Sequence, residues 1–141
     1  MKQILGIIPQ QEIDKWFLSE YKDKNIVFYS DREEHCREHI SQYESEEDYY
    51  YAMANLKEII RNPSYVYYDV NKRGLEFYKR FRNNILVAVR VSSGNELRVK
   101  SVYPVSDTKI ANRKKKEREA IENALKDKYT HKEITYSNEK I

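Results

Sequence analysis

Two histidines, His35 and His39, stand four residues apart and are the side chains of this chain best suited to acid–base chemistry. On a helix this spacing places both imidazole rings on one face. Imidazole gains and loses its proton near neutral pH, so one ring can accept a proton while the other gives one. The pair therefore indicates an acid–base site or, since rings at this spacing also chelate, part of a metal site. Two solvated histidines on a charged helix are the remaining interpretation.

Neither a metal nor a cofactor is predicted to complete this site. The sequence offers no third metal ligand at a recognisable spacing, and Cys36 would point to another side of the helix. Nothing near Cys36 activates a thiol, so we expect this residue to fill space. The chain also lacks a phosphate-binding loop and a nucleophile elbow.

Three cations stand in or beside strand-like apolar runs further along the chain, namely Lys79, Arg90 and Lys100. On a sheet face, a cation of this kind can neutralise a phosphate or stabilise the extra charge of a pentavalent phosphorane. The alternative is a solvated outer face or a charge that protects a sheet edge.

Ser101 and Tyr103 lie in the last strand-like run. Together with Leu97 and Val99 they occupy every second position of this run, so all four are predicted to lie on the same face of the strand. A pair of hydroxyls there can hydrogen-bond a phosphate or a base, and Tyr103 can stack on a nucleobase. Ordinary strand composition is the alternative, because the chain has 13 tyrosines.

Charge is unevenly distributed, although the net charge is only +3. Residues 31–58 are acid-rich and residues 72–118 are base-rich, so one side of the protein can bind a polyanion such as RNA. The residues expected to contact it are Lys100, Lys109, Arg113, Lys114 and Lys115. For the run 113–118, a solvated helix face is the other interpretation.

Composition excludes several classes of protein. With 40% hydrophobic and 35% charged residues, the 141-residue chain is predicted to form one globular domain with a modest core. It has no apolar run of about 18 residues, so we expect no membrane span and no membrane partner. The apolar start is too short for a standard secretory signal. A single cysteine suits a reducing compartment, so a cytoplasmic location is expected.

The elements that must position these residues are helical in the first half of the chain. Ser30 followed by Glu33 has the spacing of a capping box, which predicts the start of the histidine helix. Apolar periodicity, Pro9 and the stop signal Asn62-Pro63 set the other bounds. The predicted elements are a helix over 9–22, a strand over 25–30, a helix over 31–42 and a helix over 46–61.

From Ser64 onward the period changes to that of strands, and short turns separate the runs. The predicted strands cover 64–70, 75–82, 85–92 and 97–105. Consecutive strands with tight turns form an antiparallel meander. A final helix is predicted from Asp107, with fraying over 130–141. The predicted fold is therefore α+β over 1–141: N-terminal helices packed on a roughly four-stranded antiparallel sheet, with a C-terminal helix.

The order of these segments resembles the phage-associated nucleases grouped with barnase, EndoU, the tRNase colicins and RelE. The resemblance covers about residues 25–110. It rests on a strand ending in Tyr-Ser before His-x-x-x-His, on Ile-Ile-x-Asn-Pro before Ser-Tyr-Val, and on the two strand runs that contain Lys79 to Arg90 and Leu97 to Ser106.

The resemblance implies helices on a four-stranded antiparallel sheet and RNA cleavage without a metal ion. The ribose 2′-hydroxyl would attack the adjacent phosphate and leave a 2′,3′-cyclic phosphate and a 5′-hydroxyl. The family's functional positions fall on the histidines His35 and His39, the strand cation Lys79 with Arg90 as a second, the hydroxyl of Ser101, and Tyr103. At the position of Ser101 the family often has threonine.

The leading hypothesis is an endoribonuclease encoded by a phage or prophage, with RNA as substrate, toxic to its bacterial host and held in check by an inhibitor or antitoxin protein. A non-catalytic module of the same fold that binds RNA or protein is the first alternative, favoured by the mild net charge and the acidic segment. A metal-dependent hydrolase built on His35 and His39 is the second. The first hypothesis requires the histidine helix to pack across the concave face of the sheet, so that both rings line the same groove as Lys79, Arg90 and Ser101.

Overall fold

The computed structural model of the chain describes the backbone of residues 1–139 and the side chains of residues 1–126. It divides into two compact units, Met1–Ser106 and Asp107–Ile141, and each is described by itself. The single domain over 1–141 stays a prediction. The elements of the first unit are β1 (Lys2–Gly6), α1 (Gln10–Trp16), η1 (Ser19–Tyr21), β2 (Asn25–Tyr29), α2 (Arg32–Arg37), η2 (Ile40–Gln42), α3 (Glu46–Ala54), α4 (Leu56–Arg61), β3 (Tyr65–Asp69), β4 (Gly74–Arg80), β5 (Asn84–Arg90) and β6 (Glu96–Val105).

The second unit is one long helix, α5 (Asp107–Glu139), as the sequence predicts. The fraying predicted over 130–141 falls on residues whose side chains, and at 140–141 also the backbone, lie outside the described part. Within the part of the chain that the structure describes, no helix is both long and apolar enough to cross a membrane.

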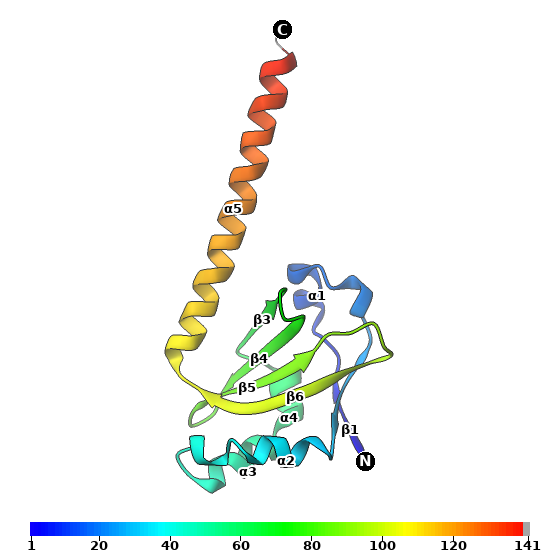
Figure 1. Cartoon of the computed structure of the whole chain (residues 1–141), viewed down its shortest axis with the longest axis vertical. Helices are drawn as coiled ribbons and strands as arrows, with labels where there is room; N and C mark the ends of the chain where they lie inside the picture. The colour runs from blue at the N-terminus through cyan, green and yellow to red at the C-terminus, as the bar shows by residue number, and fades with distance from the viewer. Residues whose placement is uncertain (140–141) are drawn as a thin grey trace. The chain divides into compact units, whose positions relative to one another are not determined.

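Six strands form one sheet in the order β1-β2-β6-β5-β4-β3 (Figure 1). The antiparallel meander from β3 to β6 is confirmed. The expected number of about four strands is wrong, because β1 pairs antiparallel with β2, and β2 pairs parallel with β6. These two pairings join segments that are distant in sequence, which turn signals do not reveal. The fold is α+β with a mixed sheet rather than a purely antiparallel one.

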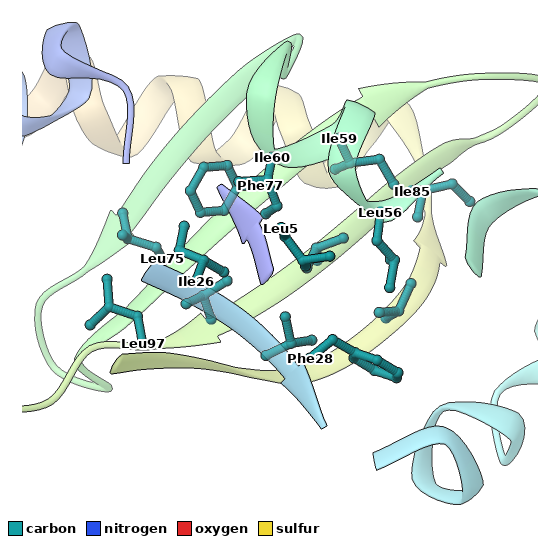
Figure 2. Packing of buried hydrophobic residues seen from close by; sticks show 14 of the residues in the cluster. Leu5, Ile26, Phe28, Leu56, Ile59, Ile60, Leu75, Phe77, Ile85 and Leu97 are labelled. Atoms are coloured by element: carbon teal, nitrogen blue, oxygen red, sulfur yellow. The ribbon is translucent and has the colours of Figure 1, made fainter. Parts of the chain in front are cut away.

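The main core lies between α4 and one face of the sheet, which we call the core face. Leu56, Ile59 and Ile60 of α4 are fully buried and lie with Leu5 of β1 and Phe77 of β4 (Figure 2). Burying several large aliphatic and aromatic side chains in this way supplies most of the stability of such a unit. Residues that alternate with these along the strands point to the opposite face, which we call the second face.

Three predicted helices are shorter in the structure than their periodicity suggests. The helix over 9–22 ends at Trp16, where Phe17 takes a left-handed φ of 57°. The helix over 46–61 divides at Asn55, whose side-chain amide donates to the Tyr51 carbonyl at 2.7 Å and so competes with continuation of the helix. The histidine helix divides into α2 and η2. Periodicity identified the buried side of the helix over 46–61 but not its break at Asn55.

The predicted capping box at Ser30 is wrong. Asp31 precedes the first residue of α2 and makes no side-chain capping bond. The Ser30 hydroxyl instead accepts a hydrogen bond from the N-terminal ammonium of Met1 at 3.2 Å. The pairing of β1 with β2 brings that ammonium to the end of β2, so a distant partner occupies the hydroxyl that local spacing had assigned to the helix.

A polar cluster attaches β1 to the rest of the sheet. The Tyr29 hydroxyl donates to Glu96 at 2.5 Å, and the Lys2 ammonium donates to it at 2.9 Å. Together they hold the pKa of Glu96 below its ordinary value of 4.5. A carboxyl group with a lowered pKa stabilises the fold above its unfolded pKa, and this contribution is lost as pH falls through the folded pKa.

We therefore expect Glu96→Gln to lower the melting temperature at neutral pH and to match the original protein once pH falls below the lowered pKa of Glu96. Thermal unfolding between pH 7 and pH 3 measures this. Glu44→Gln, which changes an exposed carboxylate, is the control and should not show the convergence. A melting-temperature difference that stays constant over the whole range would contradict the role given to Glu96.

Candidate active site

The second half of β6 is where the histidine segment meets the sheet. β2 pairs with β6 only over Glu96–Arg98, so beyond Arg98 no described strand lies on that side of β6. Residues of α2 and η2 lie beside β6 there (Figure 1). The Arg32 guanidinium donates to the Lys100 carbonyl at 2.7 Å, and Cys36 is fully buried against the core. The segment that carries both histidines is therefore fixed to this strand.

The two histidine rings are in contact. Their centroids lie 5.8 Å apart with an interplanar angle of 83°, although the α-helix ends before His39. The backbone of His39 (φ −92°, ψ 1°) begins η2 and turns closely enough to keep both rings on one side. The His35 side chain is 40% exposed, so a substrate can reach it.

His39 connects this pair to the sheet. Its Nε2 lies 3.5 Å from the Ser101 hydroxyl, although the two residues are 62 positions apart in sequence. Its ring centroid lies 5.2 Å from that of Tyr103 with an interplanar angle of 33°. The structure thus brings together four of the predicted site residues, His35, His39, Ser101 and Tyr103.

A β-bulge determines which face Ser101 and Tyr103 occupy. Val99 pairs with Val89 and Ser101 pairs with Ala88, which leaves Lys100 as an extra residue in β6. Val99 lies in the core, whereas Ser101 and Tyr103 follow the bulge onto the second face. The prediction that they share a face with Leu97 and Val99 is therefore wrong, because a bulge interrupts the period of two.

Each histidine has a partner three residues later that sequence reasoning missed. The Gln42 side-chain amide nitrogen lies 2.8 Å from Nδ1 of His39, and because that nitrogen can only donate, Nδ1 accepts. Neutral His39 then carries its proton on Nε2, the atom that faces Ser101. Glu38 lies 3.6 Å from Nδ1 of His35 and favours a proton there, which leaves Nε2 of His35 to accept one. The i, i+3 spacing of both pairs is the signal that could have identified them.

Cys36 takes no part in this arrangement as a nucleophile. Burial raises the pKa of its thiol above the ordinary value, which disfavours the reactive thiolate. Its position between α2 and the core agrees with the predicted space-filling role.

Two arginines lie on the second face beside Ser101. Arg90 follows two residues after Ala88, the partner of Ser101, and pairs directly with Arg98 of β6. Both arginines are exposed, and the Arg98 guanidinium lies 4.8 Å from the centre of the Tyr29 ring. Two like charges directly opposite each other are unfavourable unless an anion lies near them. Arg98 was not among the predicted residues, although its alternation with Leu97 and Val99 indicates an outward direction.

Lys79 is not brought to this group. It pairs with Ile85 on the core face, and its ammonium donates to the Asn62 carbonyl at 2.6 Å, just beyond the end of α4. Glu58 of α4 lies 3.6 Å from the same ammonium. Lys79 therefore neutralises the negative end of a helix on the other side of the sheet from Ser101.

The predicted RNA-contacting residues fall in both units. Lys100 is the bulge residue of β6, and its side chain is exposed. The other four, Lys109, Arg113, Lys114 and Lys115, belong to α5, so their role stays a prediction. In the described residues, no group of three or more histidine, cysteine, aspartate or glutamate side chains is placed to hold a metal ion.

A family model of nucleases matches most of the chain. The family model described as phage-Barnase-EndoU-ColicinE5/D-RelE like nuclease3 matches residues 3–112 of the 141. This range includes every candidate residue from His35 to Tyr103. Neither the curated proteins nor the solved structures contain a match to the chain.

Proposed function

The chain belongs to the phage-Barnase-EndoU-ColicinE5/D-RelE like nuclease3 family, and from that premise we propose that it is an endoribonuclease that cleaves RNA without a metal ion. The observation that carries this proposal is the contact of two histidine rings with each other and of one ring with Ser101 of the sheet. Two groups that exchange protons near neutral pH, placed beside hydroxyls and cations, are what cleavage by a neighbouring hydroxyl requires.

The proposed reaction transfers the phosphate within the substrate. The ribose 2′-hydroxyl gives its proton to a base, and a bond forms between its oxygen and the adjacent phosphorus. The bond from phosphorus to the 5′-oxygen breaks, and that oxygen takes a proton from an acid. The products are a 2′,3′-cyclic phosphate and a 5′-hydroxyl, and no oxidant or second substrate is needed.

We assign the base to His35 and the acid to His39. Glu38 favours the tautomer of His35 in which Nε2 has a free lone pair, which is the form that accepts a proton. As the acid, His39 must be doubly protonated, and its Nε2–H, which faces Ser101, would then give its proton to the leaving oxygen. When His39 is doubly protonated, rotation of the Gln42 amide would present a carbonyl oxygen to Nδ1–H, so Gln42 can support both charge states.

The remaining residues would hold the substrate. Arg90 lies on the face of Ser101 and would neutralise the phosphate during the reaction, when its charge increases. Ser101 would hydrogen-bond a phosphate oxygen, and Tyr103 would stack on a base next to the cleaved bond. The same proposal includes a phage or prophage origin, toxicity in a bacterial cytoplasm and an inhibitor protein, because an enzyme that cuts RNA must be controlled where it is made.

The deciding experiment incubates the purified protein with total RNA in the presence of EDTA. We expect cleavage to continue and to leave 2′,3′-cyclic phosphate and 5′-hydroxyl ends, identified by end-specific labelling. Loss of activity in EDTA with recovery on added zinc or manganese would establish the metal-dependent alternative. RNA binding that weakens with salt, without any cleavage, would establish the non-catalytic alternative.

A further inference from the structure

The bulge residue of β6 lies where the sheet offers it no pairing partner. β2 pairs with β6 only from Glu96 to Arg98, and Lys100 is the extra residue between the two pairs that flank it on β5. No described strand therefore pairs with Lys100. A backbone carbonyl in this position bonds either water or a side chain, and only a side chain would also fix the bulge in place.

Arg32 supplies such a side chain from α2. Its guanidinium donates to the Lys100 carbonyl oxygen at 2.7 Å, although 68 positions separate the two residues in sequence. This distance is at the short end for an N–H donor, and a charged donor makes a stronger bond than a neutral one. Arg32 is the first residue of α2, so the bond attaches the start of the histidine segment to the bulge.

A second contact, about one helical turn later, fixes the direction of α2 along β6. Cys36 follows Arg32 by four residues and shares its side of the helix, and its sulfur hydrogen-bonds the backbone of Val102. Four residues of helix advance by about 6 Å. Two residues of strand advance by about 6.6 Å. The step from Arg32 to Cys36 thus matches the step from Lys100 to Val102, and α2 follows β6 in place of the missing strand.

The contact that matters for the proposed chemistry is weaker than the bond made by Arg32. Nε2 of His39 lies 3.5 Å from the Ser101 hydroxyl, which is at the outer limit of a hydrogen bond. A contact of this length does not hold the segment in place by itself. The approach of His39 to Ser101 therefore depends on bonds elsewhere between the histidine segment and β6, of which the one from Arg32 is short and charge-assisted.

We propose that Arg32 is a positioning residue for the acid His39, an inference that rests on the proposed function. Its guanidinium holds the bulge at Lys100, and the bulge presents the Ser101 hydroxyl to Nε2 of His39. Arg32 acts on the reaction through these residues and binds no phosphate itself. The effect is large enough to measure, because a displacement of about 1 Å at a reacting group slows a reaction by up to about 100-fold.

The first measurement follows the His39 ring by NMR in the full chain without RNA. The original protein should show nuclear Overhauser contacts from this ring to Tyr103 and Ser101, and Arg32→Met should lose them. The methionine keeps an apolar stem and removes every donor. Arg32→Lys should retain the contacts, because a single carbonyl oxygen needs only one donor and the lysine ammonium supplies it.

The second measurement separates positioning from substrate binding by steady-state cleavage of a defined oligonucleotide. Arg32→Met should lower kcat on the order of 10-fold and leave KM nearly unchanged, and Arg32→Lys should restore kcat. Arg37→Met is the matched control and should change neither value. It removes the same charge from the same helix, but the partner of Arg37 is the Tyr49 side chain rather than β6.

Contacts of His39 that persist unchanged in Arg32→Met would overturn the proposal. A rise in KM at constant kcat would overturn it as well, since Arg32 would then be a direct ligand of RNA. If Arg32→Met does not fold, the original protein still decides. Its Arg32 guanidinium protons must show nuclear Overhauser contacts to the backbone of Lys100 and Ser101, and their absence would refute the link.

Failure of this inference is distinguishable from failure of the proposed function, because the NMR contacts are measured without RNA. Loss of the His39 contacts in Arg32→Met, in a protein that cuts no RNA, would support the link from Arg32 to His39 while removing the proposed activity.

Discussion

Replacement of either His35 or His39 by alanine is expected to lower kcat/KM for RNA cleavage on the order of 100-fold or more, the usual effect of losing a general acid or base. The rings lie 5.8 Å apart and share one exposed side of the molecule, so each variant removes one of two proton-transfer groups. A defined oligonucleotide with quantified product ends gives the measurement. Glu44→Ala, in the exposed part of the same segment, is the control and should keep full activity.

The pH dependence of each variant would separate the two roles. The base must be unprotonated, so it limits the rate on the acid side, and the acid must be protonated, so it limits the rate on the alkaline side. The residual activity of His35→Ala should therefore lose the acid limb of the profile, and that of His39→Ala the alkaline limb. Full activity in both variants would end the assignment of these rings to catalysis, and exchanged limbs would reverse it.

The second large effect concerns the two strand cations. Arg90→Met is expected to lower kcat/KM on the order of 100-fold, because it removes a positive charge from the face that carries Ser101. Lys79→Met is the matched substitution on the other side of the sheet. It should leave cleavage nearly unchanged and lower the free energy of unfolding by about 1 kcal/mol, since the Lys79 ammonium binds the Asn62 carbonyl.

Steady-state kinetics and urea unfolding of both variants give the comparison. A cleavage defect in Lys79→Met as large as that in Arg90→Met would return Lys79 to the catalytic group and contradict the placement of the phosphate on the second face. Arg98→Met is expected to lower kcat/KM less than Arg90→Met and more than Lys79→Met, because Arg98 pairs with Arg90 and its guanidinium lies against Tyr29.

Local patterns predicted the part of the fold that depends on neighbouring segments. The strands from Tyr65 to Val105 alternate and are joined by short turns, so their antiparallel order follows from the sequence. The parallel pairing of β2 with β6 does not, since about 70 residues separate the paired strands. This pairing matters for the site, because its end at Arg98 leaves room beside β6 for the histidine segment.

The candidate site was predictable in its residues more than in its arrangement. The spacing of His35 and His39 indicated their contact, but the approach of His39 to Ser101 depends on how α2 meets β6. Lys79 illustrates the limit of alternation. Lys79 shares a side of β4 with Phe77. The sequence alone does not show that its ammonium donates a hydrogen bond to the Asn62 carbonyl on that side.

The bulge at Lys100 makes the pairing register of β6 as important as its composition. Substituting Lys100 changes one exposed side chain, whereas a regular ladder in which Lys100 paired with Ala88 would remove the bulge. Ser101 and Tyr103 would then turn toward the hydrophobic interior, and Val102 would turn toward water. A slip of one residue in pairing would thus abolish the proposed reaction while every side chain assigned to it remained in the gene product.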